Sequence, residues 1–150
     1  MKLLVRPAIS ADIRVMMALE RHAATAAHWS APQHQAALDN TGPTRLALVI
    51  EQDSVVCGFL VARAIGAEWE IENLAVASTA RRRGLGTRLL GEFLSRVRDE
   101  GTRAVFLEVR ESNHAARRLY EKWAFVESGL RHHYYQGPPE DAILYRLDFA

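Results

Sequence analysis

The pattern of hydrophobic and polar positions divides the chain into short strands and a few amphipathic helices. Alternation over roughly 4–8 residues is typical of a half-buried strand, whereas apolar residues spaced by three and four are typical of a helix. Residues 69–76 alternate and therefore predict a strand. The next segment predicts a helix from Gly84 to about Glu100, ended by Gly101, with one apolar face formed by Leu85, Leu89, Leu90, Phe93, Leu94 and Val97.

The same reasoning predicts the remaining elements and their order. We expect helices at about 10–27, 32–40 and 113–123, and strands at 3–6, 46–51, 55–63, 103–109, 125–135 and 142–149. The first of these helices carries Ile13, Met16, Met17 and Glu20 at helical spacing. Helices and strands in this mixture predict one α/β (α+β) domain over residues 1–150, and periodicity alone leaves the strand pairing open.

Length and composition limit the classes of protein that the chain can be. The 150 residues have a net charge of +1, so binding of a nucleic acid through bulk charge is not expected. Cys57 is the single cysteine, which excludes an internal disulfide and fits a cytoplasmic protein. No run approaches the roughly 20 apolar residues of a membrane span, and we expect no membrane partner.

A basic, glycine-containing segment lies where the helix at 84–100 is expected to begin. Its residues are Arg81, Arg82, Arg83, Gly84, Leu85, Gly86 and Thr87. Unpaired N–H groups at a helix start bind anions, and glycine lets an anion approach the backbone closely. The segment lacks the Walker and dinucleotide glycine patterns. It therefore predicts a pyrophosphate site, with an ordinary basic helix start as the alternative.

The form Arg-x-x-Gly-x-Gly resembles the acetyl-CoA pyrophosphate loop of the GNAT N-acetyltransferases. Further along, the strand Leu-Glu-Val-Arg at 107–110, Ser112-Asn113, Ala116 with Leu119-Tyr120, and the pair Tyr134-Tyr135 resemble the RimI branch of that family, the ribosomal-protein-alanine N-acetyltransferases. The resemblance covers nearly the whole chain and is strongest from about Trp69 onward. It implies a central mixed sheet of about seven strands with four helices, splayed between the fourth and fifth strands.

The resemblance also implies how acetyl-CoA is held. The backbone of Leu74, Ala75 and Val76 is expected to pair with the pantetheine arm, although the same residues could be a plain core strand. The N–H groups from Arg83 to Thr87, with the three arginine side chains, are expected to bind the pyrophosphate. Asn113 is expected to hydrogen-bond the cofactor arm, with helix capping as its alternative role.

The resemblance places the proton acceptor at Glu108 and a general-acid tyrosine at Tyr120. Glu108 is a charge among apolar neighbours, which is costly unless it is paired or used. It could instead be a structural partner of an arginine. Glu70 and Glu72, which alternate on the preceding strand, are rival bases. The phenol of Tyr120 has a reference pKa of about 10, against about 8.5 for a thiol, and could donate a proton to a departing thiolate. Its alternative role is a core aromatic.

An N-terminal amine of a protein is the expected acceptor, possibly that of an alanine-starting small-subunit ribosomal protein. Near pH 7.5 a substantial fraction of α-amine is neutral, but only about one part in a thousand of lysine is. Trp29, Tyr134 and Tyr135 are candidates to line the peptide groove, or simply to pack. Lysine side chains, small-molecule amines and a non-catalytic CoA-binding role remain alternatives. The six histidines show no metal pattern, and we expect no metal and a monomer or weak dimer.

Overall fold

A computed structural model of the chain describes residues 2–21, 28–39, 42–77, 84–136 and 139–149. Its strands are β1 (Leu3–Pro7), β2 (Arg45–Gln52), β3 (Val55–Ile65), β4 (Glu68–Val76), β5 (Ala104–Arg110), β6 (Val126–Tyr135) and β7 (Glu140–Asp148). Its helices are a 3-10 turn (Ser10–Asp12), α1 (Ile13–Arg21), α2 (Ala31–Asp39), α3 (Leu85–Asp99) and α4 (His114–Lys122). Each element is within a few residues of its predicted position, except that the predicted end of the first helix lies outside the described residues.

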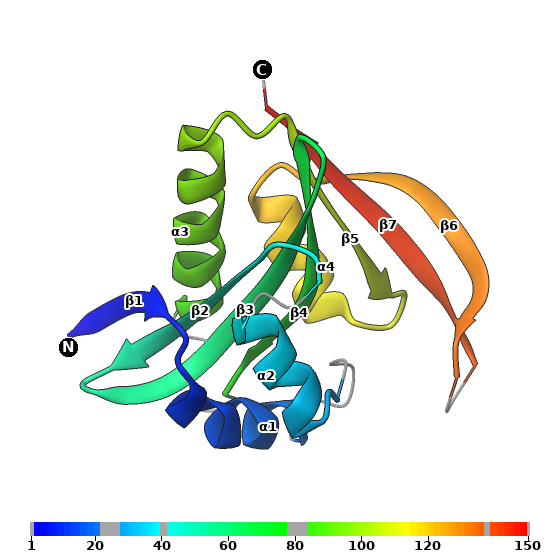
Figure 1. Cartoon of the computed structure of the whole chain (residues 1–150). Helices are drawn as coiled ribbons and strands as arrows, with labels where there is room; N and C mark the ends of the chain where they lie inside the picture. Colours follow the sequence, from blue (N-terminus) through cyan, green and yellow to red (C-terminus); the bar gives the residue numbers. More distant parts are fainter. Residues whose placement is uncertain (1, 22–27, 40–41, 78–83, 137–138, 150) are drawn as a thin grey trace.

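The strands form one seven-stranded sheet in the order β1-β2-β3-β4-β5-β7-β6. Neighbouring strands are antiparallel except β4 and β5, which are parallel. The β4–β5 register runs only from Glu68 opposite Ala104 to Ile71 opposite Leu107. Beyond those pairs the two strands diverge, as Figure 1 shows toward the bottom of the view. The mixed sheet, the helices and the splay between the fourth and fifth strands confirm the expected fold.

Helices cover both faces of the β2–β4 part of the sheet because these strands are apolar on both sides. Leu48 and Ile50 pack in the larger core with α3 and α4, while Val49 and Phe59 pack in a second core with α1 and α2. Such continuous apolar runs are typical of strands covered on both faces. The helices thereby hold β4 in place, and the carboxyl-terminal end of β4 lies at the splay.

Two positions in and before α3 require glycine, one for close packing and one for its backbone conformation. A Cβ on Gly91 of α3 would lie 2.6 Å from the Trp123 ring at the end of α4, so only glycine fits between these helices. Gly84, at the N-cap of α3, has a φ of +74°, a backbone conformation that favours glycine. The first glycine fixes the α3–α4 distance, and the second turns the chain into α3.

Candidate active site

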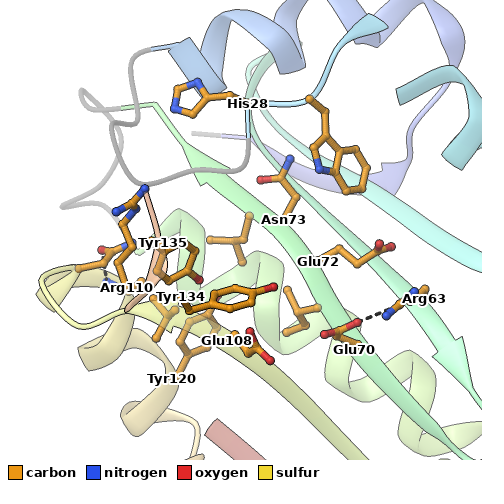
Figure 2. A pocket seen from close by; sticks show the side chains of 16 residues that line it. His28, Arg63, Glu70, Glu72, Asn73, Glu108, Arg110, Tyr120, Tyr134 and Tyr135 are labelled. Carbon is orange, nitrogen blue, oxygen red and sulfur yellow. Dashed lines mark hydrogen bonds and ion pairs between the residues drawn. The ribbon is translucent and has the colours of Figure 1, made fainter. Parts of the chain in front are cut away.

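A cavity of about 550 Å³ lies at the splay, walled by β4, β5, the start of α4, the end of β6 and the residues before α2. Figure 2 shows Glu108, Tyr134 and Tyr135 close together on one side of it, with Glu70 and Arg63 on the other. The predicted site residues that line it are Trp29, Glu70, Glu72, Leu74, Glu108, Asn113, Tyr120, Tyr134 and Tyr135. The fold therefore gathers the predicted catalytic and acceptor residues around one space.

Glu108 projects from β5 into this cavity, and its side chain is 16% exposed. The Arg131 Nε of β6 lies 3.0 Å from its Oε1, and the Tyr134 hydroxyl donates it a hydrogen bond. Burial raises the pKa of Glu108 above that of an ordinary glutamate, and nearby Glu70 adds to the rise, while Arg131 and Tyr134 oppose it. A carboxylate with a raised pKa is a stronger proton acceptor, which is the property a general base needs. The ion pair between Glu108 and Arg131 also matches the alternative role predicted for Glu108, that of a structural partner of an arginine.

The rival carboxylates of β4 are each held by an arginine of a neighbouring strand. Glu70 accepts a hydrogen bond of 2.8 Å from Arg63 of β3 (dashed in Figure 2). Glu72 accepts two from Arg45 of β2, at 2.8 and 3.3 Å. Glu72 is also the extra residue of a β-bulge, since Val61 pairs with Asn73 and Ala62 with Ile71. These pairs hold both carboxylates in place along the wall of the cavity.

Tyr120 lies on the cavity side of α4 and is 5% exposed. Its ring packs against Phe125 and Tyr145, with centroids 5.5 and 6.2 Å away. Burial raises the pKa of Tyr120 well above its usual value of about 10. The phenol is therefore protonated at physiological pH. Because a thiol has a pKa of only about 8.5, complete proton transfer to a free thiolate is uphill, and a hydrogen bond that strengthens as the thiolate leaves suits this group better.

Aromatic side chains line part of the cavity, among them the candidates predicted for the peptide groove. Burial, with Glu108 nearby, raises the pKa of Tyr135 to about 12. The Arg110 guanidinium lies 4.5 Å from the Tyr135 ring centroid, and Arg131 lies 5.1 Å from that of Tyr134. Trp29, which comes two residues before α2, also lines the cavity. Aromatic faces and ring hydroxyls of this kind suit a peptide backbone with an amine at its end.

Asn113 has one of the two roles that the sequence suggested for it. It is the N-cap of α4, and its Oδ1 accepts a hydrogen bond of 3.1 Å from the Ala116 N–H. It also lines the cavity. The capping role is confirmed, and a hydrogen bond to the cofactor arm stays a prediction.

The end of β4 and the start of α3 have features expected of an acetyl-CoA site. Leu74, Ala75 and Val76 pair with β3 through one edge, and their other edge lies past the last β4–β5 pair. The N–H groups of Leu85, Gly86 and Thr87 belong to the first turn of α3, where the helix supplies no partner. A Cβ on Gly84 would meet nothing within 4 Å. Binding of an extended arm and a pyrophosphate by these groups stays a prediction. Arg81, Arg82 and Arg83 lie outside the described residues.

Two groups of residues at the site were not predicted from the sequence. Arg131, Arg63 and Arg45 pair with the three carboxylates from other strands, and nothing local in the sequence indicates those pairs. Glu20, His34 and Asn73 form a buried polar cluster beside the cavity. A signal for the second group existed, because Glu20 follows Ile13 and Met16 on the apolar face of its helix, where a carboxylate needs a partner.

Among the described residues no group of histidine, cysteine, aspartate or glutamate could hold a metal ion. The search of the described helices for one long and apolar enough to cross a membrane finds none.

The fold and the site define a class of protein, the acetyl-CoA-dependent N-acetyltransferases. The model of the acetyltransferase (GNAT) family matches residues 14–125, and the chain belongs to this family. It is 36% identical over 114 residues to a [ribosomal protein bS18]-alanine N-acetyltransferase of Salmonella typhimurium, covering 74% of this chain and 76% of that protein. A protein of the same description from Escherichia coli K12 is 33% identical over 113 residues.

Solved structures agree with this assignment. The crystal structure of the ribosomal-protein-S18-alanine N-acetyltransferase from Escherichia coli superposes with a TM-score of 0.85 at 27% identity, covering 99% of this chain and 95% of that one. The fold is also shared, at 19% identity and a TM-score of 0.84, by the Salmonella typhimurium protein yncA, whose structure holds its cofactor acetyl-CoA. This chain is thus an N-acetyltransferase that uses acetyl-CoA.

Proposed function

We propose that the protein transfers the acetyl group of acetyl-CoA to the N-terminal α-amine of a protein that begins with alanine, with Glu108 as general base and with Tyr120, expected from the sequence to be a general acid, as hydrogen-bond donor to the leaving thiolate. The observation that carries this proposal is the position of both side chains on one cavity beside the part of β4 that lies beyond its last pair with β5. Relatives named for alanine acetylation of ribosomal protein bS18 support the acceptor class. Such an acceptor would place the reaction in the cytoplasm.

Each proposed residue has one role in the transfer of the acetyl group and its protons. Acetyl-CoA supplies the acetyl group and a thiolate leaving group. Glu108 accepts one proton from the incoming ammonium, so that the nitrogen has a free lone pair and can form a bond to the thioester carbonyl carbon. The carbon–sulfur bond then breaks, and the second proton that the nitrogen loses passes to the departing thiolate, which leaves as the CoA thiol. Tyr120 keeps its proton and donates a hydrogen bond to the sulfur, which strengthens as negative charge develops there. The first-turn N–H groups of α3 and the edge of β4 at Leu74–Val76 would hold the donor.

The pairing of the carboxylates supports an amine acceptor. Glu70, Glu72 and Glu108 line the same cavity, and each keeps one arginine partner. An incoming ammonium can replace Arg131 at Glu108 without leaving a buried charge unpaired, because Arg131 is 55% exposed and can return to water. An α-amine also needs less help to lose its proton than lysine does.

Thiol release with two peptides tests the acceptor. One peptide begins with a free alanine and contains no lysine, and its twin has a blocked N-terminus and one lysine. Release with the first peptide alone supports the proposal. Release with the second alone would make the protein a lysine acetyltransferase, and release with neither, but with a small amine, would make it a small-molecule acetyltransferase.

Gly84→Ala is expected to weaken CoA binding by roughly tenfold or more, about 1.4 kcal/mol. The new Cβ would project into the open space before α3, and a φ of +74° strains any residue with a side chain. Gly101→Ala is the matched control, because Gly101 has a φ of +86° with equally open space at the other end of α3. Calorimetric titration with CoA should detect a change in Gly84→Ala only. Equal loss in both variants would contradict the assignment of the pyrophosphate to this helix start.

Arg131→Met is expected to move the acidic limb of the pH profile of kcat/KM to higher pH. Arg131 lowers the pKa of Glu108, so its removal raises that pKa, and the base then needs a higher pH to lose its proton. Arg131→Lys keeps the charge and should shift the limb less. Arg96→Met, which removes an exposed arginine paired with Glu92 on α3, is the control. An unchanged limb in Arg131→Met would argue against Glu108 as the titrating base.

A further inference from the structure

A single buried carboxylate connects four segments on the acceptor side of the cavity. Glu20 of α1 is 1% exposed, and its Oε2 accepts hydrogen bonds from the Trp29 N–H at 2.6 Å and from the Asn73 Nδ2 of β4 at 3.0 Å. Its Oε1 is paired with the His34 Nε2 of α2. The carboxylate therefore joins α1, the segment before α2 at Trp29, α2 itself and β4.

Two of these partners belong to the cavity wall. Trp29 and Asn73 both line the cavity, and Asn73 directly follows Glu72, the extra residue of the β4 bulge. Figure 2 places Asn73 and His28 at the end of the cavity away from Tyr120. Glu20 itself does not line the cavity, and so any influence it has on the reaction must pass through Trp29 and Asn73.

The polar cluster is arranged to keep Glu20 ionised and Asn73 in one orientation. Burial opposes ionisation, but hydrogen bonds from His34, the Trp29 N–H and Asn73 together outweigh it and hold the pKa of Glu20 below its usual value. A carboxylate only accepts hydrogen bonds, so the Asn73 amide must turn its NH₂ group toward it. The His34 ring packs against Trp29 and Phe59, with centroids 5.3 and 5.8 Å away, which fixes the ring in place.

We infer that Glu20 is a positioning residue for the acceptor: by fixing Trp29 and Asn73 it sets the shape of the acceptor end of the cavity and hence the affinity for the acceptor. The inference rests on the proposed function, since it concerns the same site. A misplacement of the wall by about 1 Å is enough to change rates or affinities by as much as roughly a hundredfold. The edge of β4 at Leu74–Val76 pairs with β3 independently of Glu20, and binding of acetyl-CoA should be unaffected.

The test compares two substitutions at Glu20 with a control. Glu20→Met keeps the length of the side chain but leaves the Trp29 N–H and the Asn73 amide without their acceptor. Glu20→Gln can keep both bonds through its oxygen and present its NH₂ group to a neutral His34 ring that accepts at Nε2. Asp12→Asn is the control for general stability. Asp12 is also a buried acid, 6% exposed, but it pairs with Arg6 of β1 and does not line the cavity.

We would measure the steady-state kinetics of the variants with an alanine-starting peptide. We would also measure the Kd of that peptide for the CoA-bound protein. In Glu20→Met we expect the peptide KM and Kd to rise by about tenfold or more, with the KM for acetyl-CoA unchanged. Glu20→Gln should restore most of the peptide affinity, and Asp12→Asn should change neither constant. If Glu20→Met does not fold, Asn73→Leu, which removes the link to β4 and also changes the cavity wall at that residue, should raise the peptide KM in the same direction.

Two outcomes would overturn the inference in distinguishable ways. If the unaltered protein fails to acetylate the peptide, the proposed function fails and the inference fails with it. If the unaltered protein is active, and Glu20→Met or Asn73→Leu folds and lowers only the yield of active protein with both KM values unchanged, Glu20 contributes stability alone and the proposed function stands.

Discussion

Replacement of Glu108 by glutamine is expected to lower kcat for acetyl transfer by about 10²–10⁴-fold, the usual contribution of a general base. The glutamine keeps the size of the side chain and can still accept a hydrogen bond from Tyr134, but it cannot take a proton from the acceptor ammonium. The acidic limb of the pH profile should disappear with the carboxylate. Steady-state kinetics from about pH 6 to 9 would measure both effects.

Glu70→Gln and Glu72→Gln are the matched controls for this result. Both carboxylates line the same cavity and are paired with arginines, as Glu108 is. We expect them to change kcat much less than Glu108→Gln does. A larger loss in either of them, with Glu108→Gln nearly as active as the unaltered protein, would move the base to β4.

Tyr120→Phe is expected to lower kcat by about 10²-fold, the typical effect of removing one hydrogen-bond donor from a developing anion. The ring keeps its contacts with Phe125 and Tyr145, so stability should change little. A thioester with a more acidic thiol should recover part of the loss, because its thiolate needs less stabilisation as it leaves. Comparison of the two donors in single-turnover experiments would measure this.

Tyr145→Phe separates a catalytic hydroxyl from a structural one. Tyr145 is fully buried beside Tyr120, but its hydroxyl donates to Glu121 at 2.7 Å and accepts from Arg117 at 3.1 Å, and it does not line the cavity. Its loss should cost about 1 kcal/mol of stability and leave kcat unchanged. Equal loss of kcat in the two variants would assign the effect of Tyr120→Phe to packing.

The local pattern of the sequence was enough to predict the elements, because that pattern reflects which side of each element is buried. The apolar positions predicted for α3, from Leu85 to Val97, are all buried. The strand at 69–76 is β4, one residue longer than predicted. The parallel pairing of β4 with β5 and the splay beyond it came from family resemblance alone, since pairing depends on contacts that periodicity does not encode.

Interactions between distant parts of the chain account for what the sequence did not predict. Arg131 and Glu108 are on strands separated by α4, and Glu20 and Asn73 are 53 residues apart. In the sequence, each member of these pairs taken alone resembles an ordinary surface charge or a polar residue of the core. Only the folded sheet brings them to the cavity, where they tune the candidate base and fix the cavity wall.

The most direct test of the account is to locate the acetyl group on a product peptide that offers both kinds of amine. A peptide with a free N-terminal alanine and an internal lysine, acetylated by the protein and fragmented in a mass spectrometer, supplies this in one measurement. The account predicts acetylation of the alanine nitrogen, absent when Glu108→Gln replaces the unaltered protein. Acetylation of the lysine with a free alanine amine would contradict it.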